Sequence, residues 1–198
     1  MDNEVINKRD YYKKQRKAFL NEARILSSLF DIKEVVKVLD YFEERENAYI
    51  VMEFVQGISL RQYLESRNQP MSFTEAWNFL LPVMEALEKV HQNKLIHRDI
   101  SPDNFIIKED GSIKLLDFGS AREYAEEKTM TVLVKKGYAP PEQYSRKGKQ
   151  GPWTDIYSIC ATLYEMITGV IPQPAMERLK ADKLYLPSSY GCDITPLQ

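Results

Sequence analysis

The 198-residue sequence has few cysteines, no glycine near its start and no long apolar run. Two cysteines, Cys160 and Cys192, cannot form the set of disulfides that stabilises small secreted proteins, and we expect Cys160, in an apolar run, to be buried. The longest apolar region, residues 156–171, contains a glutamate and is too short to span a bilayer. The first residues are too highly charged for a secretion signal. These absences predict a soluble, cytoplasmic protein with no membrane segment in this chain.

The charge balance argues against a nucleic-acid partner. Lys and Arg number 27 against 29 Asp and Glu, which gives a net charge of −2. A basic run, KRDYYKKQRK at residues 8–17, could bind nucleic acid or lipid. Because later carboxylates offset this run, we favour an exposed helix start instead. The hydrophobic fraction of 43% is enough for one sizeable core.

The most informative stretch is residues 95–119, which read LIHRDISPDNFIIKEDGSIKLLDFG. Two apolar runs between Asn104 and Asp117 are joined by KEDGS, and an Asp-Gly pair in that setting predicts a β-hairpin. The hairpin would return Asp117 to the neighbourhood of Asn104, with the carboxylate of Asp99 close by. The two oxygen ligands from Asn104 and Asp117 would suit a Mg²⁺ ion, which in turn can bind phosphate oxygens. The alternative is an acidic loop beside a surface hairpin, without a metal.

These residues resemble the signature motifs of protein kinases. HRDISPDN at 97–104 is similar to the catalytic loop, H-R-D-x-x-x-x-N, and DFG at 117–119 is similar to the metal-binding motif. APPE at 139–142 follows in the family's order. The resemblance covers roughly residues 19–187. It implies a bacterial-type serine/threonine protein kinase that uses ATP and Mg²⁺ and phosphorylates a hydroxyl of a protein substrate.

The resemblance implies a chemical role for several residues. Asp99 would accept the proton of the substrate hydroxyl, while Asn104 and Asp117 would hold Mg²⁺. Arg98 would bind a phosphate on the activation segment. Candidate phosphorylation sites on that segment are Thr129 and Thr131.

Other motif residues are expected to be structural. His97 and Phe118 would serve packing rather than chemistry, and Gly119 completes the DFG motif. Glu142 closes the activation segment. Asp155, at the start of a later helix, can bond backbone N–H groups there, and the resemblance implies that it braces the catalytic loop from beneath.

The N-terminal part is expected to form a small β lobe. Apolar residues recur here at helical spacing, which predicts an amphipathic helix; they are Phe19, Ala23, Leu26 and Phe30. On this helix, Glu22 matches the glutamate that the family pairs with a phosphate-holding strand lysine. Two β-rich runs, at 35–43 and 48–55, predict an antiparallel hairpin after it.

The nucleotide is expected to bind where this hairpin ends. The backbones of Glu53 and Val55 would pair with the adenine edge, and Met52 would limit the depth of the pocket. Ile106, just after the catalytic loop, completes the expected nucleotide contacts.

Two departures from the family's pattern bear on activity. Only 21 residues precede Glu22, none of them glycine, and Lys8 after EVIN is a poor match to V-A-I-K. The Gly-rich loop and strand lysine that cover the phosphates are therefore not found in the sequence. Many serine/threonine kinases also carry a lysine two residues after the catalytic aspartate, where this chain has Ser101. Serine cannot supply that positive charge to the transferring phosphoryl group.

The sequence thus predicts one partial protein kinase domain with an α+β fold over residues 1–198. Its small-lobe part runs to about residue 53, the hinge is 54–55, and a mainly helical large lobe without its last helices follows from 56. In that lobe, Ser72 and Glu75 predict the start of a helix and Gly169 the end of another. The second helix is expected to be buried through a broad apolar face formed by Trp153, Ile156, Ile159 or Cys160, Leu163 and Ile167. Incomplete edges would expose apolar surface and could allow self-association.

Three functions remain open. The first is a serine/threonine protein kinase, the second a non-catalytic, pseudokinase-like interaction module, and the third a small-molecule kinase of the aminoglycoside or choline type. The segment from DFG to APPE argues against the third, and the intact Asp99, Asn104 and Asp117 argue against the second. The missing phosphate-covering elements argue against robust activity of this chain alone.

Overall fold

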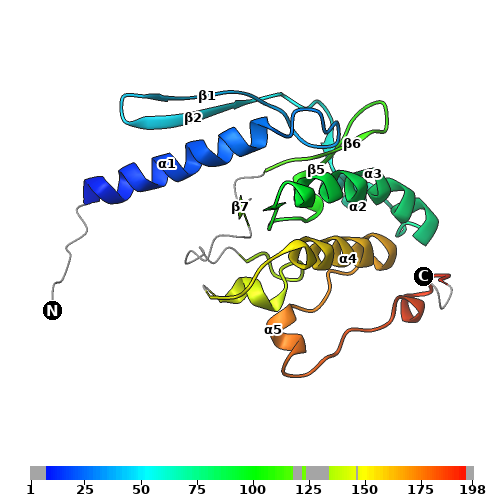
Figure 1. Cartoon of the computed structure of the whole chain (residues 1–198). Helices are drawn as coiled ribbons and strands as arrows, with labels where there is room; N and C mark the ends of the chain where they lie inside the picture. Colours follow the sequence, from blue (N-terminus) through cyan, green and yellow to red (C-terminus); the bar gives the residue numbers. More distant parts are fainter. Residues whose placement is uncertain (1–7, 118–121, 124–133, 146, 195–198) are drawn as a thin grey trace.

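The computed structural model describes residues 8–117, 122–123, 134–145 and 147–194 (Figure 1). In chain order, its helices and strands are α1 (Lys8–Ser27), β1 (Val38–Glu44), β2 (Asn47–Met52), β3 (Ile58–Ser59), α2 (Leu60–Ser66), α3 (Phe73–Gln92), β4 (Leu95–Ile96), η1 (Pro102–Asn104), β5 (Phe105–Ile107), β6 (Ile113–Leu115), β7 (Arg122–Glu123), η3 (Pro141–Tyr144), α4 (Pro152–Thr168), α5 (Ala175–Arg178) and η4 (Pro187–Tyr190).

The first lobe is helix α1 laid along the hairpin of β1 and β2 (Figure 1). The two strands are antiparallel, which confirms the predicted hairpin, although β2 ends at Met52. Helix α1 buries Ala23 and Leu26, but the predicted stripe is wrong at its ends, because Phe19 and Phe30 are exposed. Phe30 lies beyond the end of α1, where the ammonium of Lys37 covers its ring at 4.2 Å from the centroid.

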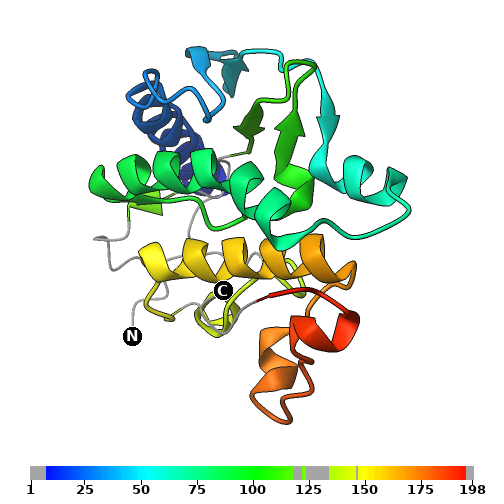
Figure 2. The same ribbon diagram turned by 90° about the vertical axis from the view of Figure 1, so that its right-hand side faces the viewer.

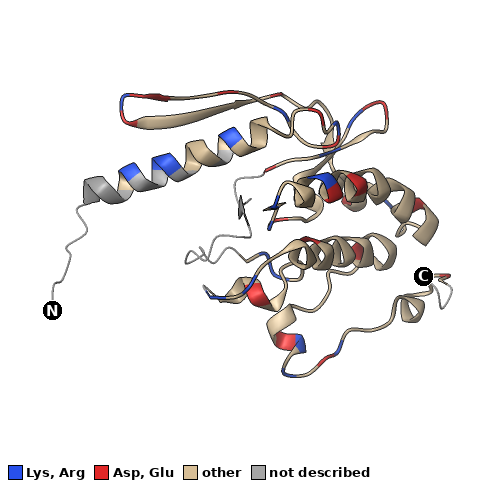
Figure 3. Ribbon diagram, in the orientation of Figure 1, with Lys and Arg blue, Asp and Glu red and all other residues tan. Residues whose placement is uncertain are grey.

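The basic run at the start of the chain lies on α1. Figure 3 shows Lys and Arg spaced along this helix, whereas residues of both signs are distributed over the other elements. Lys13 and Lys17 are exposed, as expected for a solvated helix start. Among the described residues, none of the helices combines the length and the apolar character needed to cross a membrane.

Strand β6 joins the two lobes. The N–H of Leu115 donates to the carbonyl of Glu34 at 2.7 Å, and the N–H of Val36 donates to the carbonyl of Leu115 at 3.0 Å. On its other side β6 pairs with β5, with Phe105 opposite Leu115, and β5 pairs in turn with β3. The hairpin predicted at KEDGS is therefore confirmed. Its position brings to the first lobe the end of residues 97–104, the segment predicted to be the catalytic loop.

The large lobe is built on two helices, α3 and α4, that lie side by side (Figure 2). Ser72 caps α3 by accepting the N–H of Glu75 at 3.2 Å, and Gly169 ends α4 with a φ of +72°, both as predicted. A small sheet lobe and a mainly helical lobe together confirm the α+β fold. The largest fully buried side chains include Phe105, Leu60, Leu80, Leu95, Ile96, Ile100, Leu115 and Met166.

Helix α4 buries only part of the apolar face that its sequence predicts: Ile159 and Ile167 are buried as expected. Trp153 and Ile156, expected to be buried, are 55% and 57% exposed, and Cys160 is also exposed. The buried face also carries polar groups, among them Asp155 and Glu165, that bond to neighbouring segments. These bonds help to fix the orientation of the helix, in which Trp153 and Ile156 face outward. Self-association through such surfaces stays a prediction.

Substitution of Gly57 tests the close packing of this residue against β5. A Cβ atom at Gly57 would lie 2.1 Å from the carbonyl oxygen of Ile107 and 2.7 Å from the side chain of Ile106. Gly57→Ala should therefore lower the free energy of unfolding in urea by about 3 kcal/mol. Gly111→Ala is the control, since nothing lies within 4 Å of its Cβ and only its φ of +78° opposes alanine, at about 1 kcal/mol. Equal losses in the two variants would contradict the close packing.

Candidate active site

The segment between β4 and β5 holds Asp99 and Asn104 against each other. The amide Nδ2 of Asn104 donates to the backbone carbonyl of Asp99 at 2.6 Å and to its Oδ2 at 3.0 Å. Asp99 is half-buried. Because the nitrogen of the Asn104 amide is engaged by Asp99, the amide oxygen is the atom that can face a cation.

Asp117 follows directly after strand β6. The N–H of Leu116 donates to the carbonyl of Asn104 at 2.7 Å, so the hairpin places Asp117 one residue beyond this bond, as expected. Asp117 is exposed and has a φ of +52°, an uncommon conformation for a residue with a side chain. The structure thus places Asn104 and Asp117 at the same end of the hairpin formed by β5 and β6.

This donor set fits Mg²⁺. The described residues contain no group of three or more His, Cys, Asp or Glu side chains able to hold a metal. Mg²⁺, however, is usually held by one or two carboxylates, with substrate phosphates and waters completing its coordination. Asp117 with the oxygen of Asn104 corresponds to that pattern.

His97 is fully buried and links the catalytic loop to the end of β6. Its Nδ1 accepts the N–H of Asp99 at 3.3 Å, and its Nε2 lies 2.8 Å from the carbonyl oxygen of Leu116. A carbonyl can only accept, so Nε2 carries the proton. Burial lowers the pKa of His97 despite the nearby carboxylates, first among them Asp155, and this favours the neutral ring. His97 therefore has a structural role, in agreement with the sequence interpretation.

Asp155 supports the same loop from α4. Its carboxylate, fully buried, accepts the N–H of His97 at 2.9 Å on Oδ2 and the N–H of Arg98 at 2.8 Å on Oδ1. His91 Nε2 lies 2.8 Å from the same Oδ2. These partners come from the loop and from α3, and they compensate the cost of burying the carboxylate. They hold Arg98 at a φ of +72°.

Arg98 is buried beneath the segment that precedes α4. Its Nε donates to Gln150 at 2.6 Å, and its backbone carbonyl accepts Gln143 Nε2 at 2.7 Å. Glu142 accepts the hydroxyl of Thr154 at 2.9 Å. Thr129, Thr131, Phe118 and Gly119 lie outside the described residues. The regulatory role of Arg98 therefore stays a prediction.

A pocket of about 470 Å³ opens beside the segment that links β2 to β3. This volume lies within the range of small-molecule sites. The four residues predicted to contact the nucleotide all line it, and so does Asp117. Its lining consists of Val36, Met52, Glu53, Phe54, Val55, Ile106, Leu116 and Asp117. Sequence reasoning missed Val36 and Leu116, which meet here only because β6 pairs with the chain before β1.

The side chain of Glu53 fixes the linking segment. It forms an ion pair with Lys114 of β6 and accepts the N–H of Lys37 at 2.9 Å. Although partial burial opposes ionisation, the Lys114 ammonium and the Lys37 N–H hold the pKa of Glu53 below its ordinary value. The N–H of Glu53 donates to the carbonyl of Lys37 at 2.9 Å. An adenine edge would therefore meet the carbonyl of Glu53 and the backbone of Val55.

Where the nucleotide's phosphates are expected, the part of the chain that the structure describes provides no Gly-rich loop or strand lysine. Lys8 starts helix α1, and no described strand precedes this helix. Glu22 lies within α1, but its side chain lies outside the described residues. The role expected for Glu22 stays a prediction.

Comparison with known proteins points to one family, the protein kinases. Residues 4–188 match the family model of the protein kinase domain. Serine/threonine-protein kinase PrkC of Bacillus subtilis is 39% identical over 157 residues, which cover 78% of this chain and 24% of PrkC. Serine/threonine-protein kinase PknL of Mycobacterium tuberculosis is 35% identical over 174 residues, 83% of this chain and 43% of PknL. The chain thus spans less than half the length of either relative.

A solved structure, titled PpkA-294 apo form, is similar in fold. It matches with a TM-score of 0.75 and 31% sequence identity, over 96% of this chain and 68% of that chain.

Removal of the Asp155 carboxylate tests its role in the loop. Asp155→Ala would leave the N–H groups of His97 and Arg98 buried without these acceptors, so unfolding in urea should require about 3 kcal/mol less. Asp182→Ala is the control, because it removes an exposed carboxylate that bonds Arg178 and the N–H of Leu184, and it should show no comparable loss. If the two variants unfold alike, Asp155 does not hold the loop.

Proposed function

This chain belongs to the protein kinase family, and we propose from that premise that it transfers the γ-phosphoryl group of ATP to a serine or threonine hydroxyl of a protein. The observation that supports this most is the position of Asp117. It lines the pocket that suits a nucleotide and follows the bond that ties the end of β6 to Asn104. Nucleotide, metal ligands and the carboxylate of Asp99 would then meet in one place.

Asp99 is the proposed proton acceptor. As the substrate hydroxyl attacks the γ-phosphorus, a new O–P bond forms and the P–O bond to the leaving ADP breaks. The hydroxyl proton passes to the Asp99 carboxylate, which the Asn104 amide orients. Mg²⁺, when bound, would neutralise charge on the phosphate oxygens.

The pocket residues would position the nucleotide. The apolar side chains of Met52, Val55 and Ile106 would enclose the adenine ring, and the backbone of the linking segment would bond its edge. This part of the site needs no Gly-rich loop. We therefore propose that the chain binds Mg²⁺–nucleotide weakly and transfers phosphate slowly, in the cytoplasm, where ATP is available.

Substitution of Asp99 tests the transfer reaction. With γ-labelled ATP and a generic protein substrate, Asp99→Asn should reduce transfer by about 100-fold or more, because asparagine cannot accept the proton. Asp110→Asn is the control, since Asp110 lies in the exposed turn between β5 and β6. Transfer that is equal in the Asp99 variant, or absent from the unmodified chain, would contradict the proposal and favour a non-catalytic binding module.

Substitution of Asp117 tests the metal-dependent part of nucleotide binding. By titration calorimetry, Asp117→Ala should weaken binding of ADP with Mg²⁺ by about 10-fold or more, because a metal ligand is lost, and should leave binding of ADP without Mg²⁺ unchanged. Asp182→Ala provides a matched surface control. Equal affinity of both variants in Mg²⁺ would show that Asp117 does not hold the metal.

A further inference from the structure

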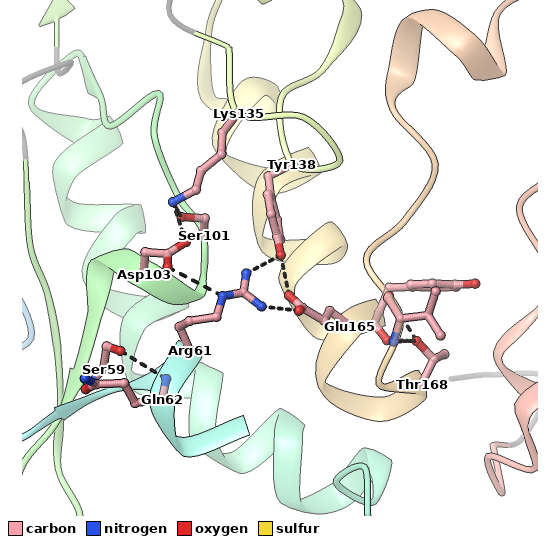
Figure 4. Close-up of polar contacts among 11 residues, drawn as sticks. Ser59, Arg61, Gln62, Ser101, Asp103, Lys135, Tyr138, Glu165 and Thr168 are labelled. Carbon is pink, nitrogen blue, oxygen red and sulfur yellow. Dashed lines mark hydrogen bonds and ion pairs between the residues drawn. The ribbon is translucent and has the colours of Figure 1, made fainter. Parts of the chain in front are cut away.

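The ammonium group of Lys135 lies on the catalytic loop at the residue that departs from the family's pattern (Figure 4). Its Nζ donates to the hydroxyl of Ser101 at 2.8 Å and lies 2.5 Å from Oδ2 of Asp103. Ser101 is fully buried and stands two residues after Asp99. Lys135 is 34 residues further along the chain, in the segment before Gly137. A lysine is therefore present at this place, but it comes from another segment.

A row of alternating charges holds Lys135 in position. Asp103 Oδ1 lies 3.5 Å from Nε of Arg61, and Arg61 pairs with Glu165 of α4 (Figure 4). Arg61 also donates to the hydroxyl of Tyr138 at 2.6 Å, and this hydroxyl donates to Glu165. The row therefore connects the loop, α2 and α4, and Lys135 is its last member.

The ionisation of Asp103 is consistent with its ion pairs to Lys135 and Arg61. Although partial burial opposes ionisation, Lys135 and Arg61 hold the pKa of Asp103 below its ordinary value, so the carboxylate is ionised at neutral pH. The carboxylates of Asp103 and Glu165 balance Arg61 and Lys135 in number. Lys135 stays 35% exposed, in contrast to the buried Ser101 beneath it. Its charge can therefore be reached by a ligand at the loop.

The geometry of an ammonium group allows one further contact. Lysine carries three N–H donors, and within the described part of the chain Ser101 and Asp103 account for two of them. The third donor can serve a phosphate oxygen. A donor that is already positioned where negative charge develops in a reaction lowers the barrier, because it needs no reorganisation.

We propose that Lys135 supplies to the transferring phosphoryl group the positive charge that many serine/threonine kinases place at the position of Ser101. This inference rests on the proposed function. Lys135 exchanges no proton in the step, since the hydroxyl proton goes to Asp99 while the O–P bond forms and the bond to ADP breaks. The charge of Lys135 stabilises the phosphoryl oxygens during that exchange.

The charge of Lys135 is available at the loop only when the segment that carries it, residues 134–137, is in the right position. Ser101 is part of the loop, whereas Lys135 reaches the loop only when residues 134–137 pack against it. The loop and this segment must therefore be assembled together before transfer. Positions 101 and 135 should also be exchangeable, because only the place of the ammonium group matters.

The first test measures transfer in lysine variants. Lys135→Met should lower kcat by about 100-fold, with the KM for ATP unchanged, because the charge acts on the transferring group and not on bound ATP. The control is Lys136→Met, which removes an exposed lysine from the same segment and should keep kcat. Lys135→Arg should retain part of the rate. The double variant Ser101→Lys with Lys135→Ser should recover activity relative to Lys135→Ser.

A second readout does not depend on turnover. Aluminium fluoride together with MgADP mimics a phosphoryl group in transfer. The unmodified chain should bind MgADP more tightly when fluoride and aluminium are present. Lys135→Met should lose this gain and keep its affinity for MgADP alone, whereas Lys136→Met should keep both.

These readouts separate failure of the inference from failure of the proposed function. If Lys135→Met keeps both kcat and the gain in affinity, the role of Lys135 is overturned while the kinase activity stands. If the unmodified chain transfers no phosphate but shows a gain that requires Lys135, the activity is contradicted while the role of Lys135 is supported. A chain that binds no MgADP would contradict both.

Discussion

The carboxylate of Asp155 determines the shape of the catalytic loop. Two consecutive backbone N–H groups, from His97 and Arg98, converge on it, and Arg98 adopts a left-handed conformation between them. A buried carboxylate without such donors would be costly, and a left-handed arginine without such acceptors would be strained. Each feature stabilises the other. The position of Asp99, one residue further on, depends on this pair.

The need of buried carboxylates for hydrogen-bond partners also explains the orientation of α4 in the large lobe. A helix of this composition would bury its largest apolar side chains if packing alone decided. Asp155 and Glu165 must instead face the loop and Arg61, because their partners lie there. Trp153 and Ile156 are therefore exposed. The helix acts as a support for the site: Asp155 near its start bonds residues 97 and 98, and Glu165 near its end pairs with Arg61 in the row of charges that holds Lys135 (Figure 4).

Local features of the fold could be predicted from the sequence. The hairpin at KEDGS, the cap at Ser72 and the end at Gly169 depend on residues that are neighbours in the chain. The contact between Lys135 and Ser101 could not, because it joins residues 34 positions apart and leaves no periodic signal. The predicted burial of Trp153 and Ile156 on α4 is wrong for a related reason. Helical periodicity records where apolar residues lie, whereas distant polar partners decided which face is buried.

Asp155 holds residues 97–104, the predicted catalytic loop, in place within this chain. Native-state hydrogen exchange at the amides of His97 and Arg98 tests it most directly. The account predicts that both amides exchange only through opening as costly as that of the buried middle of α3, because both N–H groups are bonded to a buried carboxylate. Exchange of these two amides at the rate of an unstructured segment would show that the loop is not held, and would contradict the account.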